Sequence, residues 1–265
     1  MTEKILSEYA PIFGFCPFDS IRDSLIECRA KSRIPDNAKT VIVALFPYNL
    51  GDEAYVGSDI SKYAVVPDYH QVITAKLSEA AAKLKEIYPE EEFSVFTDNS
   101  PIPEVKAAVL AGLGVKGLNG LFINPTYGSW VFIGEILTTK VYDTNKPDTQ
   151  NSDLCIKCGK CITACPTNAI GDRGINADKC LSFISQKKGE LTEEHQELIK
   201  NSGCAWGCDI CQNICPMNQN TKINPIDEFI NGAELKARTD SDIDDRAYAW
   251  RGKAVIKRNI EILNK

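Results

Sequence analysis

The sequence contains no apolar stretch long enough to cross a lipid bilayer. Its longest apolar run, from Thr40 to Pro47, is much shorter than a membrane-spanning helix requires. The beginning of the chain, MTEKILSEYAPIFGF, also lacks the pattern of a secretory signal peptide. The sequence therefore predicts a cytoplasmic protein with no membrane partner.

The chain has no excess of positive charge. It carries 30 Lys and Arg residues against 36 Asp and Glu residues, which gives a net charge of -6. Charge alone therefore predicts no general attraction to nucleic acid or to an anionic membrane. With 265 residues, 43% of them hydrophobic, the chain can form one large domain or two small ones around a proper core.

Cysteine, by contrast, is abundant, with 11 residues. Cys155, Cys158, Cys161 and Cys165 precede Pro166 in the pattern C-x2-C-x2-C-x3-C-P, which is typical of bacterial two-cluster ferredoxins. In this pattern the fourth cysteine binds the other cluster. The run predicts two 4Fe–4S clusters, and the free thiolates that bind iron agree with a reducing cytoplasm.

A second cysteine run supplies the partner that the first requires. Cys208, Cys211 and Cys215 repeat the spacing without its first cysteine. Structural zinc sites are the alternative, but they use separated C-x2-C pairs rather than nested runs that end in Cys-Pro. From the spacing, the fourth ligand of cluster II is either Cys180 or Cys204. Cluster I is assigned to Cys155, Cys158, Cys161 and Cys215, and cluster II to Cys165, Cys208, Cys211 and that fourth cysteine.

Hydrophobic patterns predict the secondary structure. The β-branched run from Thr40 to Phe46 predicts a buried strand. Apolar residues recur with a period of 3.6 from Pro67 to about Tyr88, which predicts a helix. Further strands are expected at 92–98, 120–124 and 129–137, further helices at 101–111, 192–200 and 253–263, and a linker at 140–152.

The order of these segments predicts an α+β fold with two folded domains. An α/β domain is expected at residues 1–145 and a ferredoxin-like domain with two 4Fe–4S clusters at 146–220. Residues 221–265 are expected to form a C-terminal tail with one basic helix.

Asp98 and the two histidines are isolated polar candidates. Asp98 follows the predicted strand at 92–98, where open α/β sheets place their ligand crevice. Capping of the helix near Pro101 is the alternative role for Asp98. His70 lies at a helix start, and either hydrogen bonding there or a cofactor contact is expected. His195 is expected to be a solvated helix residue.

Gly112, Gly114 and Gly117 match the G-x-G-x-x-G pattern of dinucleotide-binding proteins. That motif must follow a strand and open a helix. Here it follows the helical stretch KAAVLA and precedes the strand GLFIN, so nucleotide binding is not expected. These glycines are expected to let the backbone approach a neighbour closely.

Seven motifs resemble the epoxyqueuosine reductase family, the cobalamin-dependent iron–sulfur enzymes of queuosine biosynthesis, which are related to reductive dehalogenases. They cover the chain from about residue 40 to its end and are specific in combination. The motifs are DYH (68–70), TDNSP (97–101), AGLG (111–114), GSWVFIGE (128–135), CLSFISQKKG (180–189), GCDICQNICP (207–216) and WRGKAVIKRN (250–259).

The resemblance implies a set of site residues. It assigns the fourth ligand of cluster II to Cys180, which stands where the family has a lone cysteine, and leaves Cys204 without a cluster. It implies a base-off cobalamin between the α/β domain and cluster II, with Asp98 as proton donor. Donation by Asp98 requires a raised pKa, which a cleft against an apolar corrin favours. The implied cobalamin contacts are Ser61, Asp98, Phe122, Ile133, Leu137, Ser182, Cys208 and Asp209.

The activity implied by the resemblance is the reduction of epoxyqueuosine to queuosine in tRNA. Reduction of an epoxide to an alkene removes oxygen as water and needs two electrons and two protons. The two clusters supply electrons to low-valent cobalt, which carries the difficult step. A small electron-donor protein such as flavodoxin or ferredoxin is expected as a partner.

Three departures from the family weaken the expected contact with tRNA. The family's long C-terminal helical-repeat domain is missing from this sequence. Leu118 and Asn119 stand where family members carry a Lys-Asn pair, and Val105 stands where they carry an arginine. Because tRNA binds largely through Lys and Arg contacts to phosphate, each departure lowers the expected affinity. Lys188 is either an RNA contact or a solvated surface lysine.

Two other functions remain as alternatives. The chain is either a paralogue that reduces a small epoxide or organohalide, or a ferredoxin-type electron carrier that binds no cobalamin. Uptake of cobalamin separates the enzymes from the electron carrier. RNA binding at several salt concentrations separates the two enzymes, since phosphate contacts weaken steeply with salt.

Overall fold

The computed structural model describes residues 1–144, 154–171, 174–239 and 242–265. Contacts between residues divide the chain into two compact units, and neither is one continuous segment. Unit 1 comprises residues 1–47, 69–116 and 121–156, and unit 2 comprises residues 48–68, 117–120 and 157–265. Most of the linker predicted at 140–152 lies outside the described residues.

The units differ from the contiguous domains predicted at 1–145, 146–220 and 221–265. The segment 48–68 belongs to unit 2, where the backbone N–H of Ser61 donates to the carbonyl oxygen of Trp206 at 2.9 Å. Residues 221–265 belong to the same unit, because Ile256 is buried in one apolar cluster with Trp206. Both differences arise from contacts between distant segments, which local sequence patterns do not report.

Unit 1 is built on a four-stranded sheet. Its strands lie in the order β1-β2-β6-β3, and every neighbouring pair is antiparallel. The helices and strands of unit 1 are α1 (Thr2–Tyr9), β1 (Ile12–Pro17), β2 (Thr40–Pro47), α3 (Tyr69–Ile87), β3 (Phe93–Thr97), α4 (Glu104–Leu110), β4 (Val115–Lys116), β5 (Phe122–Ile123) and β6 (Val131–Thr138), with short 3-10 helices at Phe18–Ser20, Arg22–Ser24 and Arg29–Arg33.

The strands predicted at 40–46, 92–98 and 129–137 are confirmed as β2, β3 and β6. The strand expected at 120–124 is reduced to the two residues of β5, which pairs with β4 outside the main sheet. The sequence placed Asp98 in a ligand crevice by analogy with open parallel sheets, whereas the strands of this sheet are antiparallel. Asp98 nevertheless follows β3 directly, so its position at a strand end is confirmed.

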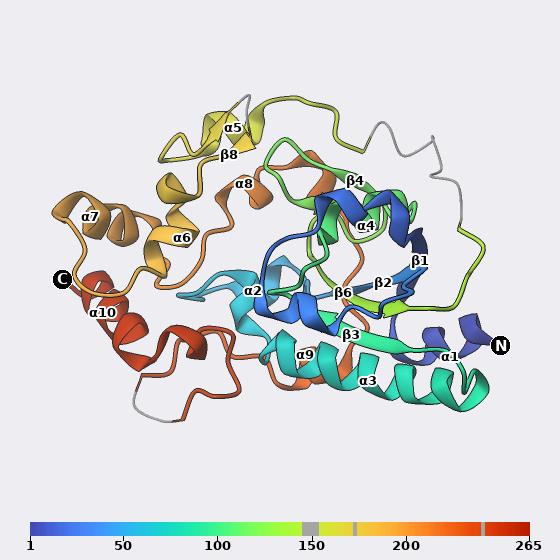
Figure 1. The fold of residues 1–265 in the computed structure, drawn as a ribbon. Helices are drawn as coiled ribbons and strands as arrows, with labels where there is room; N and C mark the ends of the chain where they lie inside the picture. Colours follow the sequence, from blue (N-terminus) through green and yellow to red (C-terminus); the bar gives the residue numbers. More distant parts are fainter. Residues whose placement is uncertain (145–153, 172–173, 240–241) are drawn as a thin grey trace. The chain divides into compact units, whose positions relative to one another are not determined.

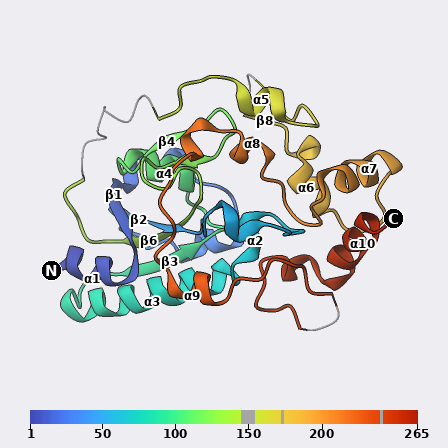
Figure 2. The same ribbon diagram turned by 180° about the vertical axis from the view of Figure 1, so that it is seen from behind.

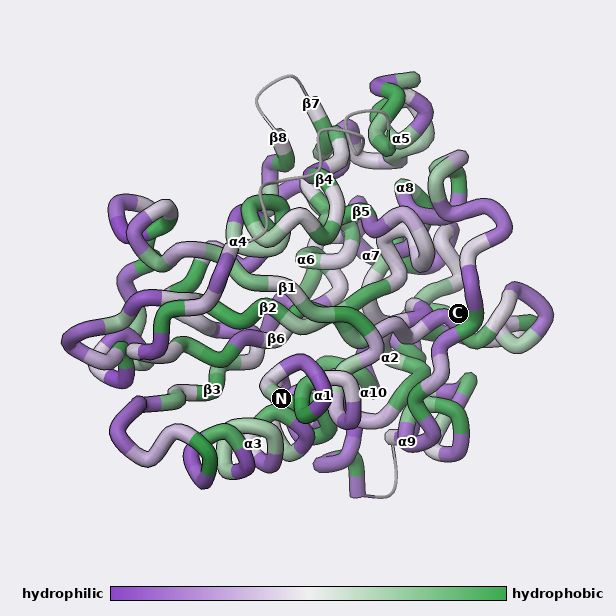
Figure 3. The backbone as a smooth tube through the Cα atoms, turned by 90° about the vertical axis from the view of Figure 1, so that its right-hand side faces the viewer, coloured by the Kyte–Doolittle hydropathy of each residue, from purple (hydrophilic) through white to green (hydrophobic). Residues whose placement is uncertain are grey.

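Both faces of the sheet are covered, and β2 is buried along its whole length. On one face α3 packs closely, because a Cβ atom on Gly134 of β6 would lie 2.7 Å from Ile73 and 2.8 Å from Leu77. Figure 1 shows α3 running alongside β3. On the other face, α4 joins an apolar cluster that includes Val43 and Ile133. Figure 3 shows β2 in hydrophobic colours, while α3 alternates between hydrophobic and hydrophilic residues.

The glycine motif after α4 has a packing role. Gly112 has a positive φ of 74°, which favours glycine, at the end of the helix. A Cβ atom on Gly114 would lie 2.1 Å from the carbonyl oxygen of Ile123, so only glycine permits this approach of β4 to β5. The expectation of close backbone contact is thus confirmed for Gly114.

Unit 2 consists of short helices joined by loops. Its last helix, α10, packs against α7, which in turn packs against α6, and the three lie together in Figures 1 and 2. The helices predicted at 192–200 and 253–263 are confirmed as α7 and α10. The elements of unit 2 are α2 (Lys62–Val65), α5 (Lys160–Ala164), β7 (Ile170–Gly171), β8 (Gly174–Ile175), α6 (Leu181–Ser185), α7 (Glu193–Ser202), α8 (Ile210–Asn213), α9 (Asp227–Asn231) and α10 (Lys253–Leu263), with 3-10 helices at Asp52–Tyr55, Ala177–Lys179, Pro216–Asn218 and Ala249–Arg251.

Candidate functional site

Asp98 begins a tight turn at the end of β3. Asp98 and Asn99 have φ values of 48° and 32°, and two consecutive residues other than glycine in this region indicate local strain. The turn is held by hydrogen bonds from the Asn99 N–H to Asp98 Oδ1 at 2.7 Å and from the Ile102 N–H to Ser100 Oγ at 3.1 Å. Strain of this kind is common at functional sites, where the surrounding structure maintains it.

Two aromatic residues at the start of α3 bind the Asp98 carboxylate. Tyr69 Oη donates to Asp98 Oδ2 at 2.8 Å, and His70 Nε2 lies 3.0 Å from the same oxygen. The hydrogen bond from His70, together with those from Asn99 and Tyr69, lowers the pKa of Asp98 to about 2, although burial opposes this shift. The Tyr69 ring also stacks on Phe132, with centroids 4.1 Å apart.

These contacts bear on three expectations from the sequence. The raised pKa expected for Asp98 against a corrin stays a prediction, and in the protein alone the hydrogen bonds lower the pKa despite burial. The role of Asp98 as a helix cap is also wrong, since Pro103 occupies the cap position of α4. The hydrogen-bonding alternative for His70 is confirmed, whereas a cofactor contact stays a prediction. Tyr69 was not singled out from the sequence, although it stands inside the DYH motif.

A cavity of about 160 Å³ in unit 1 brings several predicted residues together. Asp98, Phe122 and Ile133 all line it. Leu137 lies four residues beyond Ile133 on β6, is fully buried in the apolar cluster and does not line this cavity. The other lining residues are Tyr69, Glu104, Val105, Leu121, Ser129, Val131 and Phe132.

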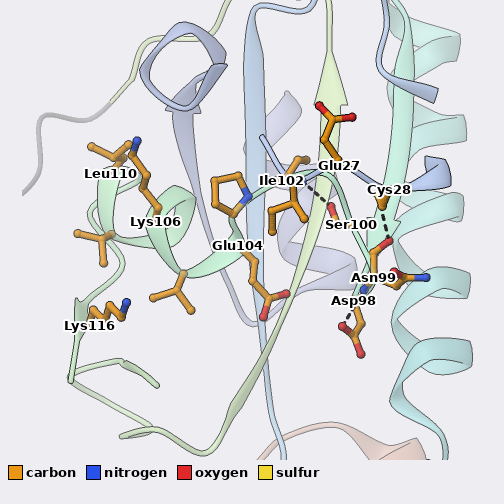
Figure 4. Close-up of a pocket in the computed structure, with 14 residues that line it drawn as sticks. Glu27, Cys28, Asp98, Asn99, Ser100, Ile102, Glu104, Lys106, Leu110 and Lys116 are labelled. Atoms are coloured by element: carbon orange, nitrogen blue, oxygen red, sulfur yellow. Dashed lines mark hydrogen bonds between the residues drawn. The ribbon is translucent and has the colours of Figure 1, made fainter. Parts of the chain in front are cut away.

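A larger cavity of about 790 Å³ also borders the Asp98 turn. Apolar side chains of α4 and two lysines, Lys106 and Lys116, line it. Figure 4 shows the Asp98 turn and Cys28 in its wall, with the Cys28 Sγ 4.0 Å from the carbonyl oxygen of Asn99. Asp98 and Glu104 line both cavities, and no sequence motif pointed to Glu104.

Cys165, Cys180 and Cys211 of unit 2 lie within electrostatic reach of Cys208. Burial raises the pKa of the Cys208 thiol to about 11, and the negative charges of Cys180 and Cys165 raise it further. Burial also raises the pKa of Cys211 to about 12, with contributions from Cys208 and Cys180. Among the described residues, no three such side chains surround a single metal position, and the four-cysteine set of cluster II stays a prediction. Thiols are the ligands that 4Fe–4S clusters use, so this set fits such a cluster.

Cys204 has a different environment. Its Sγ donates to the carbonyl oxygen of Trp206 at 3.2 Å. Burial raises the pKa of its thiol to about 12, and among the cysteines only Cys208 adds to the shift. Cys180, by contrast, influences both Cys208 and Cys211. This arrangement favours Cys180 over Cys204 as the fourth ligand, and the assignment stays a prediction.

Two of the cysteines predicted for cluster I lie on or next to helices that pack against each other. Cys161 lies on α5, which contacts α8, and Cys215 follows the end of α8 by two residues. Cys155 and Cys158 precede α5, and Cys158 is exposed. Each of these four is a free thiol, as cluster I requires.

A buried amide joins the two segments that carry Cys180 and Cys208. Asn259 of α10 is fully buried, and its Nδ2 donates to the carbonyl oxygens of Ser185 and Ala205, each at 2.7 Å. The Ser185 hydroxyl in turn accepts the N–H of Gly207 at 3.0 Å. Helix α10 therefore fixes the distance between these two segments, although it carries no ligand itself.

The predicted cobalamin contacts of unit 2 include an unpaired hydroxyl. Ser61 Oγ is buried and has no hydrogen-bond partner among the described residues. A Cβ atom on Gly207 would lie 2.0 Å from this oxygen, so glycine leaves room for it. Asp209 Oδ2 accepts the N–H of Lys62 at 2.6 Å, and Ser182 Oγ lies 3.4 Å from Gln186 Nε2. A buried hydroxyl without a partner suits a ligand with polar side groups.

Comparison with known protein families agrees with the cysteine pattern. A family described as "4Fe-4S double cluster binding domain" matches residues 154–218. A second family, described as "Epoxyqueuosine reductase QueG, DUF1730", matches residues 30–99, which include the DYH and TDN motifs. The two matches cover the cysteine segment and the part of unit 1 that contains Asp98.

Curated relatives are similar over most of this chain. An epoxyqueuosine reductase of Lactococcus garvieae is 34% identical over 244 residues, which cover 85% of this chain and 68% of the relative. Another, of Listeria monocytogenes, is 36% identical over 210 residues, which cover 74% of this chain and 54% of the relative. The chain thus spans between about half and two thirds of the length of these relatives.

Solved structures share the fold. The epoxyqueuosine reductase of Streptococcus thermophilus has a TM-score of 0.81 and 27% identity, with 99% of this chain and 79% of that chain covered. A reductive dehalogenase studied for B12-dependent dehalogenation shares the fold at a TM-score of 0.58 and 17% identity, over 98% of this chain and 36% of that chain. No described helix is long and apolar enough to cross a membrane. From its motifs, its fold and its curated relatives, the chain belongs to the epoxyqueuosine reductase family.

Proposed function

We propose that this chain reduces epoxyqueuosine to queuosine in tRNA, using cobalamin and two 4Fe–4S clusters, with Asp98 as a proton donor. The observation that carries this proposal is the binding of Asp98 by Tyr69 and His70 beside the 160 Å³ cavity. A carboxylate with two such partners at the wall of a cavity is suited to proton transfer. The curated relatives bear the name of the same activity.

Two residues that line the cavity suit part of a cobalamin ligand. Phe122 and Ile133 offer apolar surface for the flat corrin ring. When bound, cobalamin supplies a low-valent cobalt that is a strong reductant. The protein's own contribution is to hold the substrate, exclude water and donate protons.

Proton donation by Asp98 requires a change in its surroundings. With a pKa of about 2, the carboxyl group is ionised at neutral pH and has no proton to give. Contact with an apolar ligand raises the pKa, and so does the opening of its hydrogen bonds to Tyr69 and His70. His70 is positioned to return a proton, because its Nε2 lies 3.0 Å from Asp98 Oδ2.

Electrons reach the site through the two clusters. Each 4Fe–4S cluster carries one electron at a time, so two clusters match the two electrons of epoxide reduction. A small electron-donor protein, such as flavodoxin or ferredoxin, supplies them. Its binding is tested by rapid-mixing measurements of cluster reduction, first with flavodoxin and then with ferredoxin.

The tRNA partner is proposed from the relatives and from two lysines. One solved epoxyqueuosine reductase, 24% identical to this chain, is described in complex with an epoxyqueuosine-modified tRNA stem loop. In this chain, Lys106 and Lys116 border the 790 Å³ cavity beside Asp98 and place positive charge where a phosphate would pass. Lysine-to-alanine substitutions at both sites should weaken tRNA binding and reduce its dependence on salt.

The direct test uses the protein reconstituted anaerobically with iron, sulfide and cobalamin. We expect about eight irons and one base-off cobalamin per chain. Incubation with reductant and epoxyqueuosine-containing tRNA should yield queuosine, measured by mass spectrometry of the digested nucleosides. Full iron content without cobalamin uptake would instead identify an electron-transfer protein and remove Asp98 from the chemistry.

The 790 Å³ cavity favours a second candidate, the reduction of a small epoxide or organohalide. Its volume lies in the range of small-molecule pockets, and its lining is largely apolar. The free epoxyqueuosine nucleoside separates the two candidates. Turnover of the nucleoside as fast as that of tRNA would favour the small-molecule function, and turnover of tRNA alone would exclude it.

A further inference from the structure

Glu104 is an acid of the Asp98 site to which the family motifs assign no role. It is the first residue of α4, directly after Pro103, and it lines both cavities together with Asp98. Figure 4 shows the Glu104 and Asp98 side chains extending in the same direction from neighbouring backbone segments. In the part of the chain that the structure describes, no hydrogen bond or ion pair joins the Glu104 side chain to another residue.

The surroundings of Glu104 keep a proton on its carboxyl group. Burial raises its pKa to about 7, and the negative charge of Asp98 contributes to the shift. Asp98 itself is ionised at this pH, because its pKa is about 2. Between about pH 2 and pH 7 the two carboxyl groups therefore differ in charge, although they share both cavities. Such a difference between neighbouring acids commonly separates a proton donor from a charged group.

A third acid lies behind Glu104 in the sheet. Glu135 of β6 stands opposite Val43 and Phe96, on the face that α4 covers, and it is fully buried. Neither of its carboxyl oxygens has a hydrogen-bond partner among the described residues. An ionised group in such a place is strongly disfavoured, and burial raises the pKa of Glu135 well above its usual value.

The charged and titratable groups around Glu104 offer it no compensating partner. Lys106 donates to Ser24 Oγ at 2.6 Å, so it is directed to another group. The groups that line the same cavities or contact Asp98 are Glu27, Cys28, Tyr69, His70, Asp98, Lys106 and Lys116, with Glu135 behind them.

We propose that Glu104 is a second proton donor of this site, so that the Asp98–His70 pair and Glu104 each deliver one of the two protons that epoxide reduction consumes. The proposal rests on the proposed function. The C–O bonds of the epoxide break, two electrons from the clusters form the alkene, and both protons go to the oxygen, which leaves as water. Glu104 regains its proton from solvent through the 790 Å³ cavity, which it lines.

An infrared titration of the cluster-loaded protein tests the acid without any substrate. The carbonyl band of a protonated carboxylic acid should decrease as pH rises through about 7, and Glu104→Gln should remove this titrating band. Glu135→Gln should remove a second band that does not change with pH. Glu79→Gln, on the exposed side of α3, is the matched control and should change neither band. A titrating band that survives in Glu104→Gln overturns the proposal.

Turnover supplies the second test. Glu104→Gln should lower the turnover rate at least about tenfold. This loss is smaller than that usually caused by removing a general acid, because Asp98 remains. The wild-type rate should fall as pH rises through about 7, and this fall should be missing in Glu104→Gln. A variant with the wild-type rate and pH profile overturns the proposal. If the wild-type protein reduces no epoxyqueuosine, the proposed function fails, while the infrared titration still decides whether Glu104 holds the proton.

Discussion

Two buried polar side chains, one in each unit, differ in their hydrogen bonds. In unit 1, Glu135 is fully buried and has no hydrogen-bond partner among the described residues. In unit 2, Asn259 is equally buried, but its amide donates to two carbonyl groups at 2.7 Å. A buried polar group without a partner lowers stability, whereas a paired one fixes positions. The comparison indicates that Glu135 is unpaired beside the proposed proton donors of unit 1, whereas Asn259 is paired between the segments of unit 2 that carry predicted cluster ligands.

The units also differ in what stabilises them. The sheet of unit 1 is covered by helices on both faces, and β2 is buried at every residue. The cysteine loops of unit 2 contain only short helices, and their ligands need metal to form a compact site. Unit 1 is therefore expected to keep its fold without iron, while the cysteine loops of unit 2 are expected to loosen.

The largest effect is expected from Asp98→Asn, which changes the chemistry of unit 1 and leaves the cofactors in place. The amide cannot donate a proton as an acid does, so turnover should fall roughly 10²- to 10⁴-fold. Iron and cobalamin contents, measured by metal analysis and visible spectrum, should equal those of the wild type. Wild-type turnover in this variant would remove Asp98 from the mechanism.

Cys180→Ala tests the ligand set of unit 2. Loss of one thiolate should empty cluster II and reduce the iron content from about eight to about four per chain. Cys204→Ala is the matched control, since its thiol donates to the Trp206 carbonyl, and it should keep the full iron content. The opposite pair of iron counts would exchange the roles of the two cysteines.

Asn259→Leu tests whether the buried amide holds the cluster II segments. The substitution removes the donor to the carbonyl groups of Ser185 and Ala205, which should destabilise this region by about 1–3 kcal/mol. Iron release to a chelator should be faster and hydrogen exchange in α6 should increase, while exchange in β2 stays unchanged. Asn264→Leu makes the same change at an exposed position and should have no effect. Equal behaviour of the two variants would contradict a special role for Asn259.

The smallest effect concerns the pH dependence of stability at Asp98. Its pKa is lower in the folded protein than the usual 3.8, so its hydrogen bonds stabilise the folded state above pH 3.8. This contribution is lost as pH falls through about 2. Because the side chain is 53% exposed, solvent screening limits the effect to less than about 1 kcal/mol. The difference in thermal midpoint between the wild type and His70→Ala should be constant near neutral pH and shrink in acid.

Local patterns were sufficient for much of the fold. The apolar run of β2, the helical period of α3 and the amphipathic pattern of α10 depend only on neighbouring residues, and all three elements lie where the sequence predicts them. Strand β1 was missed because Ile12–Pro17 contains a glycine, a cysteine and a proline and has no clear alternation. The membership of 48–68 in unit 2 depends on contacts with distant residues, and no local pattern reports those.

The candidate site was predicted in part. Asp98 and His70 stand in motifs, but their hydrogen bond joins residues 28 positions apart and follows only from the packing of α3 on the sheet. The hydrogen bonds that lower the pKa of Asp98 in the protein alone were not predicted, because their donors Tyr69 and His70 belong to a different element, α3. Glu104 appears as an ordinary glutamate in the sequence, and Glu135 stands out only as the last residue of the GSWVFIGE motif. The structure shows that Glu104 lines both cavities and that Glu135 is fully buried.

Segments of unit 1 and unit 2 alternate along the chain, and this limits how the protein can be modified by evolution or by engineering. Unit 2 includes residues 48–68, and the pairing of Ser61 with Trp206 ties that early segment to the cysteine region. A gene fragment that begins at residue 157 would therefore encode an iron–sulfur module without one of its own structural parts. End-to-end fusion or exchange of such fragments would not transfer a complete module, so the two halves of the gene are expected to be inherited together.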